Sequence, residues 1–331
     1  MVYIASNISW IGEHRMKQTI LEVLEENLND YISGEEIAQR LNMTRANIWK
    51  EIQKLKNSGF EISSVRNLGY KLVDYQGNLS RSLILNNTFR LSAIEVFDTI
   101  TSTNDYAKTK IHDNLLILAN HQSKGKGRMQ RDFFSPSKSG IYMSLVLVPK
   151  LEIMDVQLVT ICAALAVCQA LEKLYELQPK IKWLNDIYLG DQKVCGILSE
   201  GEIELETNSF RHIILGIGVN TNSVNDIPSE LVSIYTALSQ HTAEPINRNQ
   251  LVIEIINNFY DFYDNLPTNR LKLIDMYKLR SNVLGKFVTI RNQGNETYLA
   301  KDISPEAHLI VVDKLGNELE LNSGEISLGG L

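Results

Sequence analysis

Apolar residues recur at helical spacing in two neighbouring stretches near the start of the chain. The first follows Ser33, which with Glu36 has the spacing of a helix-capping box, and the second begins at Thr44 after a turn. The inward-facing positions are Ile37, Ala38, Leu41, Ile48, Ile52 and Leu55. Two short β runs then surround a turn at residues 67–69. This order predicts a winged helix-turn-helix domain over residues 16–78.

Strand-like runs and long helical patterns alternate between residues 80 and 278. The strand candidates are residues 115–120, 141–148, 180–183, 187–198 and 212–220. Residues 155–177 repeat apolar positions at helical spacing, which predicts a core helix lying on a sheet. A second packing helix is expected at residues 249–266. The pattern predicts a mixed α/β central domain.

Four short β runs follow, separated by Gly and Asn turns. They cover residues 286–291, 297–304, 308–313 and 318–322. Short strands at regular spacing predict a small β-barrel over residues 283–331, so the whole chain is of the α+β class.

The composition is typical of a globular protein, with slightly more acidic than basic residues. The 331 residues include 33 Lys and Arg against 39 Asp and Glu, and the net charge of -6 argues against indiscriminate nucleic-acid or membrane binding. The three cysteines form no C-x-x-C pair, and the chain begins with neither a leader pattern nor a membrane-spanning apolar run. We expect a cytoplasmic protein with no membrane partner. Because the first amphipathic pattern starts at Met16, we expect that residue to be the physiological start.

The winged-helix region contains a positively charged stretch, although the chain as a whole is acidic. Residues 43–71 carry six cations and two acids. These charges could simply keep the helix faces solvated, but their combination with a turn and a wing favours DNA binding. The expected DNA-contacting residues are Thr44, Arg45, Asn47, Trp49, Lys50, Lys54 and Arg66.

The stretch 122-QSKGKGRMQR-131 combines two glycines with four cations. Glycines let backbone N–H groups approach an anion, and Lys and Arg neutralise it. No G-K-[ST] sequence closes this loop, so it is not a Walker A motif. Taken alone, it could equally be a cationic surface loop.

Two further polar groups stand out in the central region. In 182-KWLNDIY-188, Lys182 alternates with Ile181 and Trp183, so its ammonium should project from one face of a sheet. Asn185 and Asp186 could merely form the next turn. The cluster 101-TSTNDYA-107 could likewise only cap a short helix.

Together, and in this order, the motifs resemble those of bifunctional biotin protein ligases that also repress the biotin operon. The matching residues are Ser102, Thr103 and Asn104 for S-T-N; Gly125, Gly127, Arg128 and Arg131 for the glycine-rich loop; 182–186 for K-W-P-N-D; 193–198 for K-x-x-G-I-L; and Gly216, Gly218 and Asn220 for G-x-G-x-N. The resemblance covers nearly the whole chain from Met16. Two positions depart from the family pattern, with Lys126 replacing arginine and Leu184 replacing proline, and we expect altered affinity or retention of the intermediate.

The resemblance implies a central domain related to class II synthetases, an SH3-like C-terminal barrel and a two-step reaction. Biotin and ATP would form biotinyl-5'-AMP, and the biotinyl group would pass to a lysine of a biotin carboxyl carrier protein. The implied catalytic residues are Lys182 and Arg128. The implied biotin-binding residues are Ser102, Thr103, Asn104, Gln122, Lys126, Gly127, Arg128, Lys182, Gly196, Gly216 and Gly218. The implied ATP- and adenylate-binding residues are Gly125, Lys126, Arg128, Arg131, Asn185, Lys193 and Asn220. Mg²⁺ would accompany the phosphates without a dedicated protein site.

The same resemblance implies regulation by assembly. The adenylate-bound chain would form a homodimer that places two winged helices on a two-fold operator DNA. Acceptor protein and second protomer would then compete for one surface.

Two alternatives remain at this point. A lipoate or octanoate protein ligase would use a similar central fold, although the S-T-N cluster and Gln122 favour a ureido ring over an aliphatic acyl group. A non-catalytic biotin-sensing DNA-binding regulator would keep the ligand site and lose the chemistry, and retention of Lys182, Arg128 and Asn185 argues against it.

Overall fold

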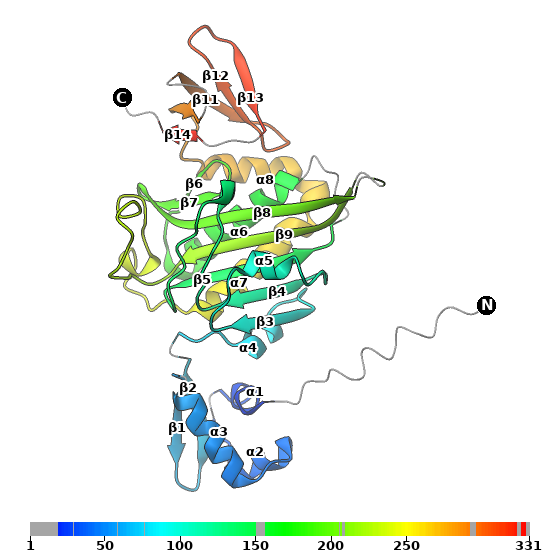
Figure 1. The fold of residues 1–331 in the computed structure, drawn as a ribbon, viewed down its shortest axis with the longest axis vertical. Coiled ribbons are helices and arrows are strands. Elements are labelled where there is room, and N and C mark those ends of the chain that lie inside the picture. The colour runs from blue at the N-terminus through cyan, green and yellow to red at the C-terminus, as the bar shows by residue number, and fades with distance from the viewer. Residues whose placement is uncertain are drawn as a thin grey trace, which may run out of the picture. The chain divides into compact units, whose positions relative to one another are not determined.

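The computed structural model describes residues 19–28, 30–57, 59–75, 77–149, 156–204, 206, 209–291, 296–322 and 326–328. The expected start at Met16 lies outside these residues. The chain divides into two compact units, one ending at Leu83 and the other beginning at Ile84. Figure 1 shows the elements of each unit.

The first unit is a winged helix-turn-helix, as predicted. Its elements are α1 (Ile20–Glu25), α2 (Gly34–Leu41), α3 (Arg45–Asn57), β1 (Glu61–Val65) and β2 (Gly69–Asp74). Ile37, Ile48 and Ile52 are completely buried in one core with residues of α1 and the hairpin. The strands β1 and β2 pair antiparallel to form the wing.

Helix capping in this unit differs in detail from the prediction. Ser33 accepts a hydrogen bond from the Glu36 backbone N–H at 3.1 Å, but the Glu36 carboxylate pairs with Arg40 at 2.6 Å. The reciprocal capping box occurs instead at the start of α1, between Thr19 and Glu22. A nearby cation therefore competes successfully for the Glu36 side chain.

A seven-stranded sheet forms the centre of the second unit. Its strands are β3 (Ala93–Phe97), β4 (Leu115–Ala119), β5 (Gly140–Leu147), β6 (Lys180–Lys182), β7 (Asp186–Leu189), β8 (Gln192–Glu204) and β9 (Ser209–Asn220). The order is β3-β4-β5-β9-β8-β7-β6, and only β3 and β4 run parallel. The single strand expected at residues 187–198 is wrong, because the chain turns at Gly190 with φ 60° and forms the β7–β8 hairpin.

Helices cover both faces of this sheet. They are α5 (Thr103–Ala107), α6 (Val156–Tyr175) and α7 (Arg248–Asp264). α8 (Leu266–Arg280) contacts α6 and α7, and α4 (Arg81–Asn86) contains the boundary between the two units. Figure 1 shows α5 on one face and α6 with α7 on the other. Among the described helices only α6 has the length and composition of a membrane span, but its most apolar window is 78% buried, as expected for a core helix.

The C-terminal region is a five-stranded antiparallel sheet. Its strands are β10 (Phe287–Ile290), β11 (Thr297–Ile303), β12 (Leu309–Val312), β13 (Glu318–Leu321) and β14 (Ile326–Leu328), in the order β13-β12-β11-β10-β14. The edge strands β13 and β14 do not pair within the described residues, so the predicted closed barrel is not confirmed. This sheet contacts the central region through a hydrogen bond from Trp183 Nε1 to the Ala307 carbonyl, 2.9 Å, and an ion pair between Lys278 and Asp302, 2.6 Å.

Candidate ligand-binding site

A cavity of about 710 Å³ opens on the sheet beside the glycine-rich loop. All of the residues expected to bind biotin, ATP or the adenylate line it, except Gly125. Its lining carries six Lys or Arg side chains and only two carboxylates, Asp132 and Asp186. The cavity is therefore suited to an anionic ligand.

The glycine-rich loop is folded back on itself. The Phe133 N–H donates to the Gly125 carbonyl and the Gly127 N–H to the Arg131 carbonyl, each at 2.8 Å. A Cβ at Gly125 would come within 2.6 Å of the Phe133 carbonyl oxygen, so only glycine permits this approach. Gly125 thus shapes the loop from outside the cavity.

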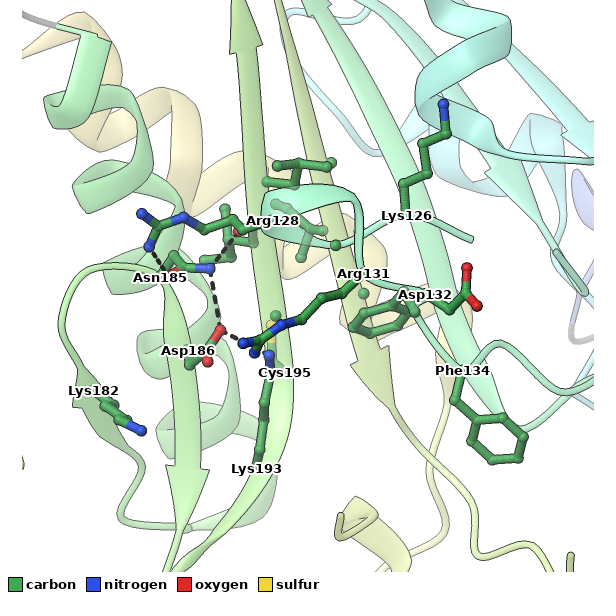
Figure 2. Close-up of a pocket in the computed structure, with 18 of the residues that line it drawn as sticks. Lys126, Arg128, Arg131, Asp132, Phe134, Lys182, Asn185, Asp186, Lys193 and Cys195 are labelled. Atoms are coloured by element: carbon green, nitrogen blue, oxygen red, sulfur yellow. Dashed lines mark hydrogen bonds and ion pairs between the residues drawn. The ribbon is translucent and has the colours of Figure 1, made fainter. Parts of the chain in front are cut away.

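The cations of this region have different partners. Arg128 Nη1 donates to Asn185 Oδ1 at 2.8 Å, and Lys193 pairs with Asp186 at the same distance. Lys126 pairs with Asp105 at 2.7 Å, a hydrogen bond that raises the pKa of Lys126, and Figure 2 shows its side chain directed away from Arg128. The three cations therefore do not converge on one point.

Lys182 is placed differently from these cations. It ends β6, where its neighbour Ile181 is buried. Trp183, which follows the strand, is also buried but lines the same cavity as Lys182, so the predicted alternation does not extend to it. Its Nζ lies 5.9 Å from the centroid of the Tyr188 ring, and no carboxylate partner occurs among the described residues. A cation that lines a cavity without a carboxylate partner is available to a ligand anion.

The S-T-N residues lie at the N-terminus of α5 and meet Gln122. Ser102 caps the helix by accepting from the Asp105 N–H at 3.3 Å. Gln122 Oε1 accepts from both the backbone N–H and the hydroxyl of Thr103, at 2.8 and 3.0 Å. These side chains are buried, so their polar atoms have fixed orientations.

Gly216 and Gly218 on β9 line the cavity, and side chains of the protein also lie close to both. A Cβ at Gly216 would lie 2.3 Å from Asn104 Oδ1, and one at Gly218 would lie 2.3 Å from the Phe133 ring. Neither position therefore has room for a larger side chain.

Several lining residues were not predicted from the sequence. They include Phe133, Phe134, Tyr142, Leu231, Ile234 and Tyr235 in the central region and Thr289, Ile290, Arg291, Ile326 and Ser327 in the C-terminal sheet. The rings of Phe134 and Tyr235 pack edge to face with centroids 6.0 Å apart, and burial raises the pKa of Tyr235 to about 12. The adjacent Phe133 and Phe134 could have been recognised directly after the loop. Nothing in the local sequence marks the residues of the C-terminal sheet as part of a cavity.

The cysteines offer no nucleophile at the cavity. Cys162, Cys168 and Cys195 are all buried, and burial raises the pKa of each thiol. They are small apolar residues of the interior.

The expected DNA-contacting residues are all exposed on the winged helix. Trp49 is 56% exposed, which is unusual for a tryptophan without a partner surface. Thr44 accepts from the Asn47 N–H at 3.2 Å and so caps α3, while Lys54 pairs with Glu51 at 2.6 Å. These two residues have local structural roles in addition to their position on the surface.

Comparisons with known proteins agree with this division of the chain. The Biotin/lipoate A/B protein ligase family matches residues 94–220, and an HTH domain family matches residues 17–71. The bifunctional ligase/repressor BirA of Bacillus subtilis is 32% identical over 325 residues, which cover 95% of this chain and 99% of that protein. BirA of Escherichia coli is 29% identical over 69% of this chain and 70% of its own length.

Solved structures of biotin protein ligases are also similar to most of this chain. The biotin protein ligase from Aquifex aeolicus, determined in complex with biotin and ATP, superposes with a TM-score of 0.63 at 25% identity and covers 72% of this chain and 99% of its own. The extent of the match with the Bacillus subtilis protein includes both the winged helix and the cavity. The chain therefore belongs to the family of bifunctional biotin protein ligases and repressors.

Proposed function

We propose that this protein activates biotin with ATP and transfers it to a lysine of a biotin carboxyl carrier protein. The observation that carries the proposal is the position of Lys182, a cation without a carboxylate partner among the described residues, in a cavity also lined by the glycine-rich loop and the S-T-N cluster. The same chain would repress biotin genes through its winged helix.

In the first step, a biotin carboxylate oxygen attacks the α-phosphorus of ATP. A new P–O bond forms, the bond from the α-phosphorus to the bridging oxygen breaks, and pyrophosphate leaves with the electron pair. Lys182 would bridge carboxylate and α-phosphate, and Arg128 would assist from the loop. Fixed cations stabilise the charge that develops on these oxygens more than they stabilise the separate reactants.

In the second step, the neutral amine of the acceptor lysine attacks the acyl carbon of the adenylate. An amide bond forms, the bond from the acyl carbon to the phosphate oxygen breaks, AMP leaves, and the amine loses a proton to solvent. Protein side chains form no covalent intermediate. The adenylate must be protected from water, and we infer that the loop at residues 122–131 covers it.

We assign the two ends of the cavity to different parts of the ligand. The S-T-N residues and Gln122 would bind the ureido ring of biotin, because they present fixed polar atoms in a buried setting. Phe134 and Tyr235 would contact the adenine base. Lys193, Arg131 and Asn220 would lie along the phosphates. A magnesium ion would be held mainly by phosphate oxygens and water, since one of the two lining carboxylates already pairs with Lys193.

We further propose that adenylate binding favours a homodimer in the cytoplasm, and that this dimer binds a two-fold operator DNA. The C-terminal sheet would be of the SH3-like type, and the domains would span residues 16–78, 80–278 and 283–331. The exposed residues of α3 and the wing would face the DNA.

The substrate is tested by measuring pyrophosphate release with ATP and magnesium in the presence of biotin, lipoate or octanoate. Release with biotin alone supports the proposal. Release with lipoate or octanoate in preference to biotin would identify the other branch of the ligase family, and binding of biotin without any release would identify a sensor.

A further inference from the structure

Two side chains of the glycine-rich loop bind to two different elements at the cavity. Lys126 Nζ lies 2.7 Å from a carboxylate oxygen of Asp105, in the first turn of α5. Arg128 donates at 2.8 Å to Asn185, in the turn that follows β6. Figure 2 shows the Lys126 side chain directed away from Arg128. The loop therefore connects the helix that carries the S-T-N residues with the turn that follows Lys182.

The backbone of the loop is a short hairpin that separates these two contacts. Lys126 forms an antiparallel bridge with Asp132, and the Gly127 N–H donates to the Arg131 carbonyl. Residues 128–130 form the 3-10 turn at the tip. Lys126 thus holds the hairpin at one arm and Arg128 holds it at the tip. Movement of the whole hairpin away from the cavity would break both contacts.

The surroundings of Asp105 leave its carboxylate to Lys126. The other nearby cation, Lys108, lies 3.8 Å from this carboxylate and pairs more closely with Glu200, at 2.7 Å. The side chains of Lys126 and Asp105 are 45% and 37% exposed. An ion pair in such a setting contributes little to the stability of the fold, so its effect is expected on the position of the loop.

We propose that Asp105 is a positioning residue that holds the glycine-rich loop over the adenylate through Lys126. This inference rests on the proposed function. Lys126 would act on the ligand by closing the loop, and not as a counter-ion of its phosphate. The two roles predict opposite effects of neutralising Asp105. Loss of a closing contact opens the site, whereas loss of an acid that neutralises a phosphate-binding lysine strengthens the binding of an anion.

The test measures how fast labelled, preformed biotinyl-5'-AMP dissociates from the full chain. Asp105→Asn should speed dissociation about three-fold, the effect of losing one exposed ion pair. Lys108→Met is the matched control, because it removes the other cation near Asp105 and leaves the pair with Lys126 in place. Its rate should equal that of the wild-type protein. Dissociation from Asp105→Asn that is slower than from the control, or equally fast, would overturn the inference.

A double-mutant cycle and a salt series distinguish the ion pair from a general structural effect. Lys126→Met should speed dissociation as much as Asp105→Asn, and the double variant should be no faster than either, because the same contact is lost once. The difference between Asp105→Asn and wild type should vanish at about 1 M salt, where the screening length is about 3 Å. Independent, multiplicative effects, or a difference that salt does not change, would overturn the inference. Wild-type protein that does not bind biotinyl-5'-AMP would instead overturn the proposed function, and this inference with it.

Discussion

Arg128 of the glycine-rich loop donates from Nη1 to Asn185 Oδ1 at 2.8 Å, and so ties the loop to the turn that follows Lys182. Asn185 is itself held, because its Nδ2 donates to the Ile197 carbonyl on β8 at 2.7 Å. The loop is therefore anchored to the sheet at the position of the proposed catalytic lysine. Figure 2 shows this arrangement from the side of the cavity.

Loss of this anchor should release the loop. Asn185→Ala removes the acceptor for Arg128, and we expect biotinyl-5'-AMP to dissociate about ten-fold faster, since one hydrogen bond to a charged group is lost. A filter-binding chase of labelled adenylate measures the rate. Asn265→Ala serves as the control, because Asn265 bonds only within its own helix region, to the Asp261 carbonyl, and does not line the cavity. Equal rates in both variants would contradict the anchoring role.

Gly216 should not tolerate a side chain. Gly216→Ala would place its Cβ 2.3 Å from Asn104 Oδ1, and Asn104 is held by hydrogen bonds to Ser144 and Glu200. We expect the free energy of unfolding to fall by about 1–3 kcal/mol, as for overpacking elsewhere. Urea denaturation gives the value. Gly127→Ala meets no atom closer than 3.5 Å and should change stability much less. A Gly216→Ala protein as stable as Gly127→Ala would disprove this account of the strand.

Charge on α3 should govern DNA affinity. Lys50 is exposed at the predicted DNA-facing surface, and Lys50→Ala should reduce operator affinity at every salt concentration and lower the slope of log K against log salt by about one. Fluorescence anisotropy over a salt series measures both. Arg40 pairs with Glu26 and Glu36, so Arg40→Ala is the matched control with the slope unchanged. Biotinylation should be normal in both. An unaltered slope in Lys50→Ala would place the DNA on another surface.

Glu25 should make the winged helix less stable as the pH rises. Burial raises its pKa above the ordinary 4.5, although Ser80 and Ser82 donate hydrogen bonds to it. The folded state then holds the proton more tightly than the unfolded state, so the free energy of unfolding falls as pH rises from about 4.5 through the raised pKa. In the Glu25→Gln variant this side chain does not titrate, so its contribution to the pH dependence is lost. Hydrogen exchange of the α1 and α2 amides, compared between wild type and variant at each pH, should show a difference that grows across this range. A constant difference would mean that the pKa of Glu25 is ordinary.

The sequence predicts much of the fold because many elements have strong local patterns. The long helix at α6 and the strands β4, β5 and β9 follow from apolar periodicity, and the winged helix follows from two short helices and a hairpin. The turn at Gly190 was missed because only two residues, Gly190 and Asp191, separate β7 from β8. The last strand, Ile326–Leu328, is too short to show a pattern of its own.

The cavity was predictable only where its residues form motifs. Those of the loop, of 182–186 and of the S-T-N cluster were named in advance and lie together. The contact between Asn104 and Glu200 joins residues 96 positions apart, and Phe134 meets Tyr235 from a distant loop. Such pairs depend on how strands and loops are brought together in three dimensions, which no local spacing records.

Ligase activity that depends on Lys182 can be measured as the intact mass of a biotin carboxyl carrier domain after incubation with this protein, biotin and magnesium ATP. We expect the carrier to gain the mass of one biotinyl group. Lys182→Ala should slow the gain by about 100- to 1000-fold, the usual effect of removing one electrostatic contact to a transition state. Lys180→Ala, an exposed lysine of the same strand, should leave it unchanged. A carrier whose mass does not change with the wild-type protein would exclude the proposed ligase activity, and a Lys182→Ala variant as active as Lys180→Ala would exclude the catalytic role of Lys182.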